Sequence, residues 1–206
     1  IYCSFAEKAG NIGCKLFNSS FNYYGMDKIY KSFSINNIED AIDAVKTLDI
    51  KGFAVTMPFK VEVIDYLDEL ESGVQSIGAV NTVINDNGYL IGYNTDYLAA
   101  KEVLDECLGI DLYILGNGGY SRAVQQAAKD LGYKPNIISR SNWKNIKNIK
   151  DSIVYNCTPI RKIKVDKSNE FIDCIVSTPT GSRLSWIQAS HQFKLYTGKE
   201  LPIRRM

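Results

Sequence analysis

A glycine-rich turn between an apolar run and an amphipathic run constrains this chain more than any other feature. Residues 111–132 read DLYILGNGGYSRAVQQAAKDLG. The apolar run 112–115 predicts a strand, and the alanines and valine of 123–128 recur at helical spacing. A strand, a tight turn and a helix in this order are typical of α/β folds with a parallel sheet. The turn itself carries glycine or a small residue at four positions: Gly116, Gly118, Gly119 and Ser121.

Each of these small residues has a physical use in a turn that binds a dinucleotide. Gly116 permits the tight turn, Gly118 lets the backbone approach a pyrophosphate, and Ser121 allows close packing of helix on sheet. The helix N-terminus adds amide donors and a partial positive charge. The alternative is a tight strand-to-helix turn that binds nothing.

The residues after the next strand bear on which dinucleotide would bind. The strand NIIS ends at Ser139 and is followed by Arg140, Ser141 and, further on, Lys144. Folds that bind NAD place an acidic residue here to hold the ribose 2′-hydroxyl, whereas an arginine suits the 2′-phosphate of NADP. Because no acid stands beside Arg140, the sequence predicts NADP. Solvated cations at a helix start are the alternative interpretation of Arg140 and Lys144.

The part of the chain before the glycine turn also alternates between strand and helix. Strands are predicted at 1–5, 29–35 and 53–55, helices at 11–24, 37–50, 61–70 and 97–108, and a hairpin around Asn87-Gly88. The predicted fold class is therefore α/β with two α/β domains and a cleft between them. We expect residues 1–98 to form a substrate-binding domain and 99–180 a Rossmann-like domain that binds a dinucleotide. The C-terminal segment, 181–206, is expected to carry a helix, 182–197, that returns to the first domain.

Composition excludes several classes of function. A net charge of +1 with 45% hydrophobic and 23% charged residues describes an ordinary globule, with no reason to expect nucleic acid or an anionic membrane. The single histidine, His191, excludes a histidine-rich zinc site, and no metal is expected. Five cysteines without a Cys-x-x-Cys pair fit reduced core residues. Without a long apolar run or a signal peptide, a cytoplasmic protein is predicted.

Two charged residues stand at the ends of predicted elements in the first domain. Lys60 closes the stretch GFAVTMPFK, just past a buried strand, where α/β sheets present binding groups. Asp96 follows the hairpin and precedes a helix. If the two meet, Lys60 could exchange a proton with a substrate while Asp96 orients it. The alternatives are a solvated turn lysine and a helix N-cap formed by Asp96 with Thr95.

Seven motifs occur in the order seen in shikimate dehydrogenases: VTMPFK, GAVNTV, GYNTD, GNGGYSRA, SRS, NCTP and LSWIQASHQF. The chain resembles that family over nearly its whole length. The resemblance implies the NADP-dependent, reversible reduction of 3-dehydroshikimate to shikimate, with Lys60 and Asp96 as the catalytic pair. It also implies that Thr56, Asn81 and Gln188 bind substrate hydroxyls and that Thr158, in NCTP, joins the cofactor site.

The chain departs from the family pattern in ways that concern the substrate and the second domain. Asn11 and Gly13 stand where the family has a pair of serines for the substrate carboxylate, and Phe17-Asn18 replaces His-Asn. Asn11 can still donate hydrogen bonds to a carboxylate. This pattern resembles the divergent shikimate dehydrogenase-like group. The second domain is shortened after SRS and after DCIVSTP, and Arg161-Lys162 replaces the usual Gly-Met.

Three functional hypotheses follow. The first is an NADP-dependent dehydrogenase that acts on shikimate or a similar hydroxylated ring carboxylate and could form a homodimer. The second is a non-catalytic relative that binds such a metabolite or a nucleotide. The third is an α/β hydrolase with Ser121 as nucleophile, which is disfavoured because the turn is not G-x-S-x-G and His191 lies on a late helix. The retained Lys60, Asp96, glycine turn and Arg140 favour the first.

Overall fold

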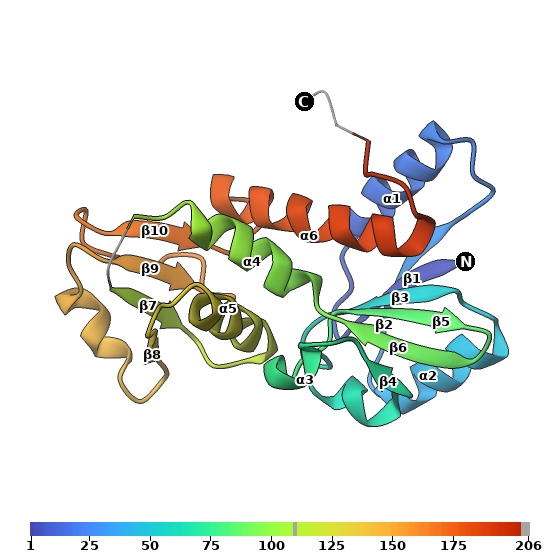
Figure 1. The fold of residues 1–206 in the computed structure, drawn as a ribbon, viewed down its shortest axis with the longest axis horizontal. Coiled ribbons are helices and arrows are strands. Elements are labelled where there is room, and N and C mark those ends of the chain that lie inside the picture. Colours follow the sequence, from blue (N-terminus) through green and yellow to red (C-terminus); the bar gives the residue numbers. More distant parts are fainter. Residues whose placement is uncertain (109–110, 203–206) are drawn as a thin grey trace. The chain divides into compact units, whose positions relative to one another are not determined.

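The computed structural model describes residues 1–108 and 111–202 and contains two separate sheets with flanking helices (Figure 1). The chain divides into two compact units. Unit 1 comprises Ile1–Thr95 and Ala189–Met206, and unit 2 comprises Asp96–Gln188. The predicted fold class, two α/β domains, is confirmed. The functional domain limits given above stay a prediction.

Unit 1 is built on a mixed sheet of six strands. They are β1 (Tyr2–Ala6), β2 (Tyr30–Ser34), β3 (Gly52–Val55), β4 (Glu69–Leu70), β5 (Thr82–Asp86) and β6 (Tyr89–Tyr93), in the order β2-β1-β3-β5-β6-β4. Strand β3 is parallel to β1 and antiparallel to β5. The carboxyl end of β3 therefore lies beside the start of β5. The predicted hairpin is β5–β6, and its turn residues Asn87 and Gly88 both have positive φ, as such a turn requires.

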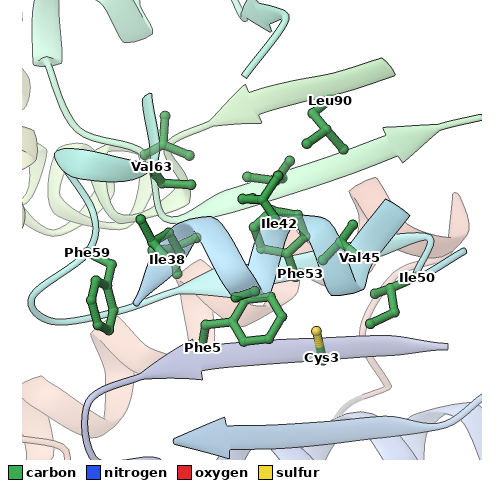
Figure 2. Packing of buried hydrophobic residues seen from close by; sticks show 14 of the residues in the cluster. Cys3, Phe5, Ile38, Ile42, Val45, Ile50, Phe53, Phe59, Val63 and Leu90 are labelled. Carbon is green, nitrogen blue, oxygen red and sulfur yellow. The ribbon is translucent and has the colours of Figure 1, made fainter. Parts of the chain in front are cut away.

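Helix α2 (Ile38–Thr47) covers one face of this sheet. Its N-terminus is capped by Asn37, whose side-chain oxygen accepts a hydrogen bond of 2.7 Å from the Glu39 amide. Figure 2 shows the α2 side chains packed against the aromatic residues Phe5 and Phe53 of the sheet. The buried positions are those expected from the helical spacing: Ile38, Ala41, Ile42 and Val45.

An aromatic cluster lies on the face of the sheet opposite to α2. Successive side chains of a strand point to opposite faces, so Tyr2 of β1 faces this cluster while Cys3 and Phe5 face α2. The cluster joins helix α1 (Ile12–Tyr23) to the C-terminal part of helix α6 (Pro179–Thr197). The rings of Phe17 and Tyr30 stack with centroids 4.6 Å apart, and Phe21 lies 5.7 Å from Phe193. Burying several large rings in one cluster is a major source of stability for a unit of this size.

The helix predicted at 61–70 is wrong. The structure has a 3-10 helix, η1 (Glu62–Tyr66), and then strand β4, which pairs in parallel with β6. Asp68 forms the link: its amide donates to the Leu90 carbonyl (3.0 Å) and its carboxylate accepts from the Leu90 amide (2.7 Å). Pairing with a neighbouring strand outweighs the local helical pattern here. A short helix that was not predicted, α3 (Val74–Ile77), follows.

Unit 2 contains four parallel strands in the order β10-β9-β7-β8. They are β7 (Leu112–Leu115), β8 (Asn136–Ile138), β9 (Ile153–Asn156) and β10 (Glu170–Asp173). After β7 the chain turns first to the β8 side and later to the β9 side. The point where the strand order reverses is thus next to the carboxyl end of β7, where open α/β sheets bind ligands. The glycine turn lies at that point.

The two faces of the unit 2 sheet are covered unequally. Helices α4 (Thr95–Asp105) and α5 (Gly119–Asp130) and the start of α6 supply the larger cluster, with Leu104, Val124 and Leu184. In the described part of the chain, the other face is covered by the 3-10 helix η2 (Trp143–Asn148) and the extended segment 161–165. This thin layer is the consequence of the shortening noted in the sequence.

The second shortening, between β10 and α6, is held by a compact polar turn. The Thr180 hydroxyl accepts from the Asp173 amide (2.9 Å), and the Thr178 hydroxyl donates to the Ile175 carbonyl (2.8 Å). The α6 backbone therefore comes very close to the turn. A Cβ atom built on Gly181 would lie 2.0 Å from the Ile175 carbonyl oxygen, so only glycine fits at this position.

The described part of the chain contains no helix long and apolar enough to span a membrane. Within the same residues, no group of three or more His, Cys, Asp or Glu side chains could hold a metal ion. All five cysteines are free thiols. The sequence predicted that all five would be core residues. Cys3 is buried in the unit 1 core, but the other four are half-buried. Burial raises the pKa of the Cys107 thiol to about 12.

Candidate functional site

Lys60 lies in a tight turn at the carboxyl end of β3. The turn is fixed by its backbone: the Thr56 amide donates to the Phe5 carbonyl (3.0 Å), and the Lys60 carbonyl accepts from the Val80 amide (2.7 Å). Phe59 is buried in the core between these two points. Lys60 and Thr56 are both half-buried. The structure therefore brings these two predicted residues together on a rigid turn.

Asn81 lies next to the same edge of the sheet, because its carbonyl accepts a 2.8 Å hydrogen bond from the Val55 amide at the end of β3. Its side chain is 2% exposed and is largely occupied by structural partners. The side-chain oxygen accepts from the Thr95 amide (2.8 Å) and the Thr82 hydroxyl (2.9 Å), and the amide donates to the Thr95 hydroxyl (2.9 Å). Asn81 thus holds the first residue of α4.

Gln192 joins the Asn81 network and was missed by the sequence analysis. Its side-chain amide donates to the Thr82 hydroxyl (2.8 Å), and Gln192 is buried. Gln188, the glutamine predicted to bind substrate, is half-buried on α6 and donates to the Ser185 carbonyl (3.1 Å). His191 is half-buried on the same helix. The signal that could have singled out Gln192 is its burial among hydrophobic neighbours on α6, which requires a hydrogen-bonding partner.

Asp96 is 6% exposed and lies inside the first turn of α4, since that helix begins at Thr95. The alternative role as N-cap is therefore wrong. A carboxylate in the first helical turn is stabilised by the helix dipole. Within unit 2, a pair of tyrosines lies near it: the hydroxyls of Tyr120 and Tyr155 are 2.9 Å apart. Burial and the Tyr155 hydroxyl, with a smaller effect of Asp96, hold the pKa of Tyr120 well above its usual range.

The glycine turn has the geometry that its residues predict. Gly116 has φ +103°, and a Cβ there would lie 2.9 Å from the Thr158 methyl group. A Cβ on Gly118 would meet nothing within 4 Å, so the backbone is open to a ligand. Helix α5 begins at Gly119 without a side-chain cap, which leaves its first amides available to an anion.

Ser121 has a structural role in this turn. It is fully buried, and its hydroxyl donates to the Gly116 carbonyl over 2.8 Å. A nucleophile must reach its substrate, so a buried hydroxyl bonded to the backbone does not fit a hydrolase. The hydrolase hypothesis therefore finds no support in the turn that suggested it.

The residues after β8 lie beside the glycine turn, because the Gly116 amide donates to the Ile138 carbonyl (2.8 Å). The hydroxyls of Ser139 and Ser141 are 2.9 Å apart, and both Arg140 and Lys144 are exposed. Asn142, which the sequence analysis missed, accepts from the Ser139 amide (2.7 Å) and shapes this loop.

The departures from the family pattern near α1 can be related to the packing around Tyr30. Asn11 is exposed and makes no side-chain cap of the helix. Phe17 is 2% exposed in the aromatic cluster, and the Asn18 side chain bonds both the amide (2.7 Å) and the carbonyl (2.9 Å) of Tyr30. A Cβ on Gly13 would lie 3.2 Å from the Tyr30 ring. A serine at position 13 would therefore contact the Tyr30 ring closely, and the ring would have to shift slightly to admit it.

We expect Gly13→Ser to lower the free energy of unfolding by about 1–2 kcal/mol, because the stacked Tyr30 ring must move to admit the side chain. The matched control is Asn11→Ser, whose exposed site should tolerate the change within about 0.5 kcal/mol. Urea unfolding followed by circular dichroism measures both. Equal stability of the two variants would show that the ring moves without cost.

The chain is similar in sequence and in structure to proteins of one known family. The model of the shikimate dehydrogenase substrate-binding domain matches residues 12–83. A shikimate dehydrogenase-like protein of Haemophilus influenzae is 30% identical over 241 aligned residues, which cover 94% of this chain and 89% of that protein. The chain belongs to the shikimate dehydrogenase family. The resemblance found from the motifs is thereby confirmed.

Two further relatives support this family assignment. The crystal structure of shikimate dehydrogenase from Aquifex aeolicus superposes with a TM-score of 0.83 at 26% identity, covering 98% of this chain and 92% of that one. A shikimate dehydrogenase (NADP(+)) of Pyrococcus furiosus is 42% identical over 125 residues. That match covers 59% of this chain and 45% of the relative. The fold of the family is therefore present throughout, despite the shortened unit 2.

Proposed function

We propose that this chain is an NADP-dependent oxidoreductase that interconverts 3-dehydroshikimate and shikimate, or acts on a similar hydroxylated ring carboxylate. The observation that carries the proposal is the gathering of Lys60, Thr56 and Asn81 at one edge of the unit 1 sheet. A cation and a hydroxyl held on rigid elements are groups that can protonate and bind a polyhydroxylated substrate. Asn81 stays a proposed substrate ligand, although Thr82 and Thr95 already occupy most of its side chain. Lys60 and Asp96 stay the proposed catalytic pair, and Gln188 a proposed substrate ligand.

The unit 2 residues fit a dinucleotide. The open backbone at Gly118 and the uncapped start of α5 suit a pyrophosphate, and exposed Arg140 suits a 2′-phosphate. When bound, NADP would exchange a hydride with the substrate carbon. The further cofactor residues we propose are Gly116, Gly119, Ser121, Ser139, Ser141, Lys144 and Thr158.

Lys60 has the proton-transfer role in this mechanism. Its ammonium group would donate a proton to the oxygen of the carbonyl as the carbonyl is reduced, and take it back in the reverse direction. Its rigid backbone limits the positions of the ammonium group, which favours a productive orientation. Thr56 and Asn11 would orient the substrate. In this chain, Asn11 and Gly13 replace the two serines that bind the substrate carboxylate in the family.

A direct assay tests the proposal. The purified protein is mixed with NADP or NAD and with shikimate, quinate or related ring carboxylates, and the absorbance of the reduced nicotinamide is followed. We expect reduction of NADP with at least one of these substrates and much slower reduction with the Lys60→Ala variant. Binding of NADP without turnover on any ring carboxylate would contradict the proposal.

A non-catalytic relative that binds a metabolite or nucleotide is the second candidate. The shortened second domain and the loss of the serine pair at Asn11 and Gly13 favour it, because both are departures from the family pattern. The absorbance assay together with isothermal titration separates the two candidates, since a binding protein would give binding heats in the titration but no turnover in the assay. A homodimer and a cytoplasmic location also stay predictions.

We expect Arg140→Ala to weaken NADP binding by about 1–3 kcal/mol, the scale of a lost charge-assisted hydrogen bond, and to leave NAD binding nearly unchanged. The physical reason is that only NADP carries the 2′-phosphate. Isothermal titration with each cofactor measures the difference. Lys134→Ala, which removes an exposed cation on the loop before β8, is the control. Equal weakening of both cofactors would show that Arg140 does not contact the 2′-phosphate.

A further inference from the structure

The glycine turn of unit 2 has a neighbouring strand on each side. In the order β10-β9-β7-β8 all strands are parallel, so the ends of β8, β7 and β9 reach the same edge. Arg140 follows β8, whereas Arg161 lies a few residues past the end of β9. Adjacent strands are about 4.8 Å apart. The two arginine-bearing segments therefore flank Gly116 from opposite sides.

The turn after β9 is held firmly against the glycine turn. Asn156 is fully buried, and its side-chain oxygen accepts from the amide (2.9 Å) and the hydroxyl (2.7 Å) of Thr158. Its amide donates to the Ile160 carbonyl (3.3 Å) and to the Asp173 carboxylate (2.9 Å). The Thr158 methyl group faces Gly116, where an added Cβ would lie only 2.9 Å away. Arg161 is the residue directly after this fixed turn.

The residues that follow leave the cations of this segment in solvent. Ile163 and Val165 pack against the cluster that lines the thin face of the sheet. The alternate residues Lys162 and Lys164 are exposed, as is Arg161. Within residues 1–108 and 111–202, the Arg161 guanidinium forms no ion pair or side-chain hydrogen bond. Its charge is therefore not neutralised by a protein partner.

We propose that Arg161 is a second cationic ligand of the cofactor site and binds the pyrophosphate of the dinucleotide. The inference rests on the proposed function and names a residue that the family pattern lacks, since Arg161 stands in place of glycine. Arginine suits this role because its planar fork pairs with phosphate oxygens through two parallel hydrogen bonds.

The position of Arg161 selects the pyrophosphate over the 2′-phosphate. The pyrophosphate of a dinucleotide lies at the N-terminus of the helix after the glycine turn, here Gly119 of α5. The 2′-phosphate lies on the side of the following strand, β8, where Arg140 stands. Arg161 is on the β9 side of the turn, so its effect should not depend on the 2′-phosphate.

Calorimetric titration of the full chain with four ligands tests the inference: NADP, NAD, ADP and 2′-AMP. Arg161→Met should weaken the binding of NADP, NAD and ADP by a similar factor of roughly tenfold or more, and leave the binding of 2′-AMP unchanged. Arg140→Ala should show the opposite pattern, with loss of NADP and 2′-AMP only. Lys164→Met is the matched control, because it removes an exposed cation of the same segment farther along the chain.

The possible results separate the inference from the proposed function. If the wild-type protein binds NADP and Arg161→Met binds NADP and ADP equally well, the inference fails and the proposed function stands. If Arg161→Met weakened the binding of NADP but not that of NAD, the inference would also fail, because Arg161 would then contact the 2′-phosphate. A wild-type protein that binds none of the four ligands would overturn both. Thermal unfolding of each variant checks that the exposed substitutions leave the fold intact.

Discussion

Replacing Lys60 with alanine should lower turnover by roughly 10²–10⁴-fold, the effect typical of removing a general acid or base. Lys60 lies on a turn whose backbone is tied to Phe5, Thr56 and Val80, so the substitution should not disturb the fold. Apparent substrate affinity should fall much less, because the hydroxyl of Thr56 and the other polar groups remain. Steady-state kinetics with the substrate found in the assay measures both quantities.

The second variant in this experiment changes the proposed partner of Lys60: Asp96→Asn should also slow turnover. The losses of the single variants should not add in the double variant, because residues that act as one unit give non-additive effects. Lys46→Ala, an exposed lysine near the end of α2, is the control and should leave turnover unchanged. Normal turnover by Lys60→Ala would mean that Lys60 is a solvated turn residue and that the catalytic proposal is wrong.

Gly181→Ala should destabilise unit 2 by about 2–4 kcal/mol. Overpacking against a backbone atom cannot be relieved by a side-chain rotation, and here the added Cβ would lie 2.0 Å from the Ile175 carbonyl oxygen. The short turn is further tied by the hydroxyls of Thr178 and Thr180, so it has little freedom to retreat.

Tryptophan fluorescence reports this change selectively, because both tryptophans, Trp143 and Trp186, lie in unit 2. The urea midpoint of the fluorescence transition should fall for Gly181→Ala. Gly10→Ala is the matched control, since a Cβ there meets nothing within 4 Å and Gly10 is exposed. An unchanged midpoint in Gly181→Ala would show that the turn moves away without cost.

The candidate site residues whose local conformation could be predicted are those that lie within a single strand–turn–helix segment. Gly116, Gly118 and Ser121 belong to this group, because a tight turn requires small residues wherever it occurs. The structural role of Asn81 could not be predicted, since its partner Thr95, 14 residues further along the chain, is brought to it by the β5–β6 hairpin. Gln192 was missed for the same reason: its partner is far away in the sequence.

The sequence by itself determined the alternation of strands and helices, the hairpin at Asn87-Gly88 and the glycine turn. Each of these depends on the spacing of apolar residues or on backbone freedom at one position, which are local properties. Only the tertiary structure decided that Glu69–Leu70 pairs with β6 instead of continuing a helix, and that the Tyr30 ring lies close beside Gly13. These outcomes depend on contacts between distant segments, whose energies outweigh local preference.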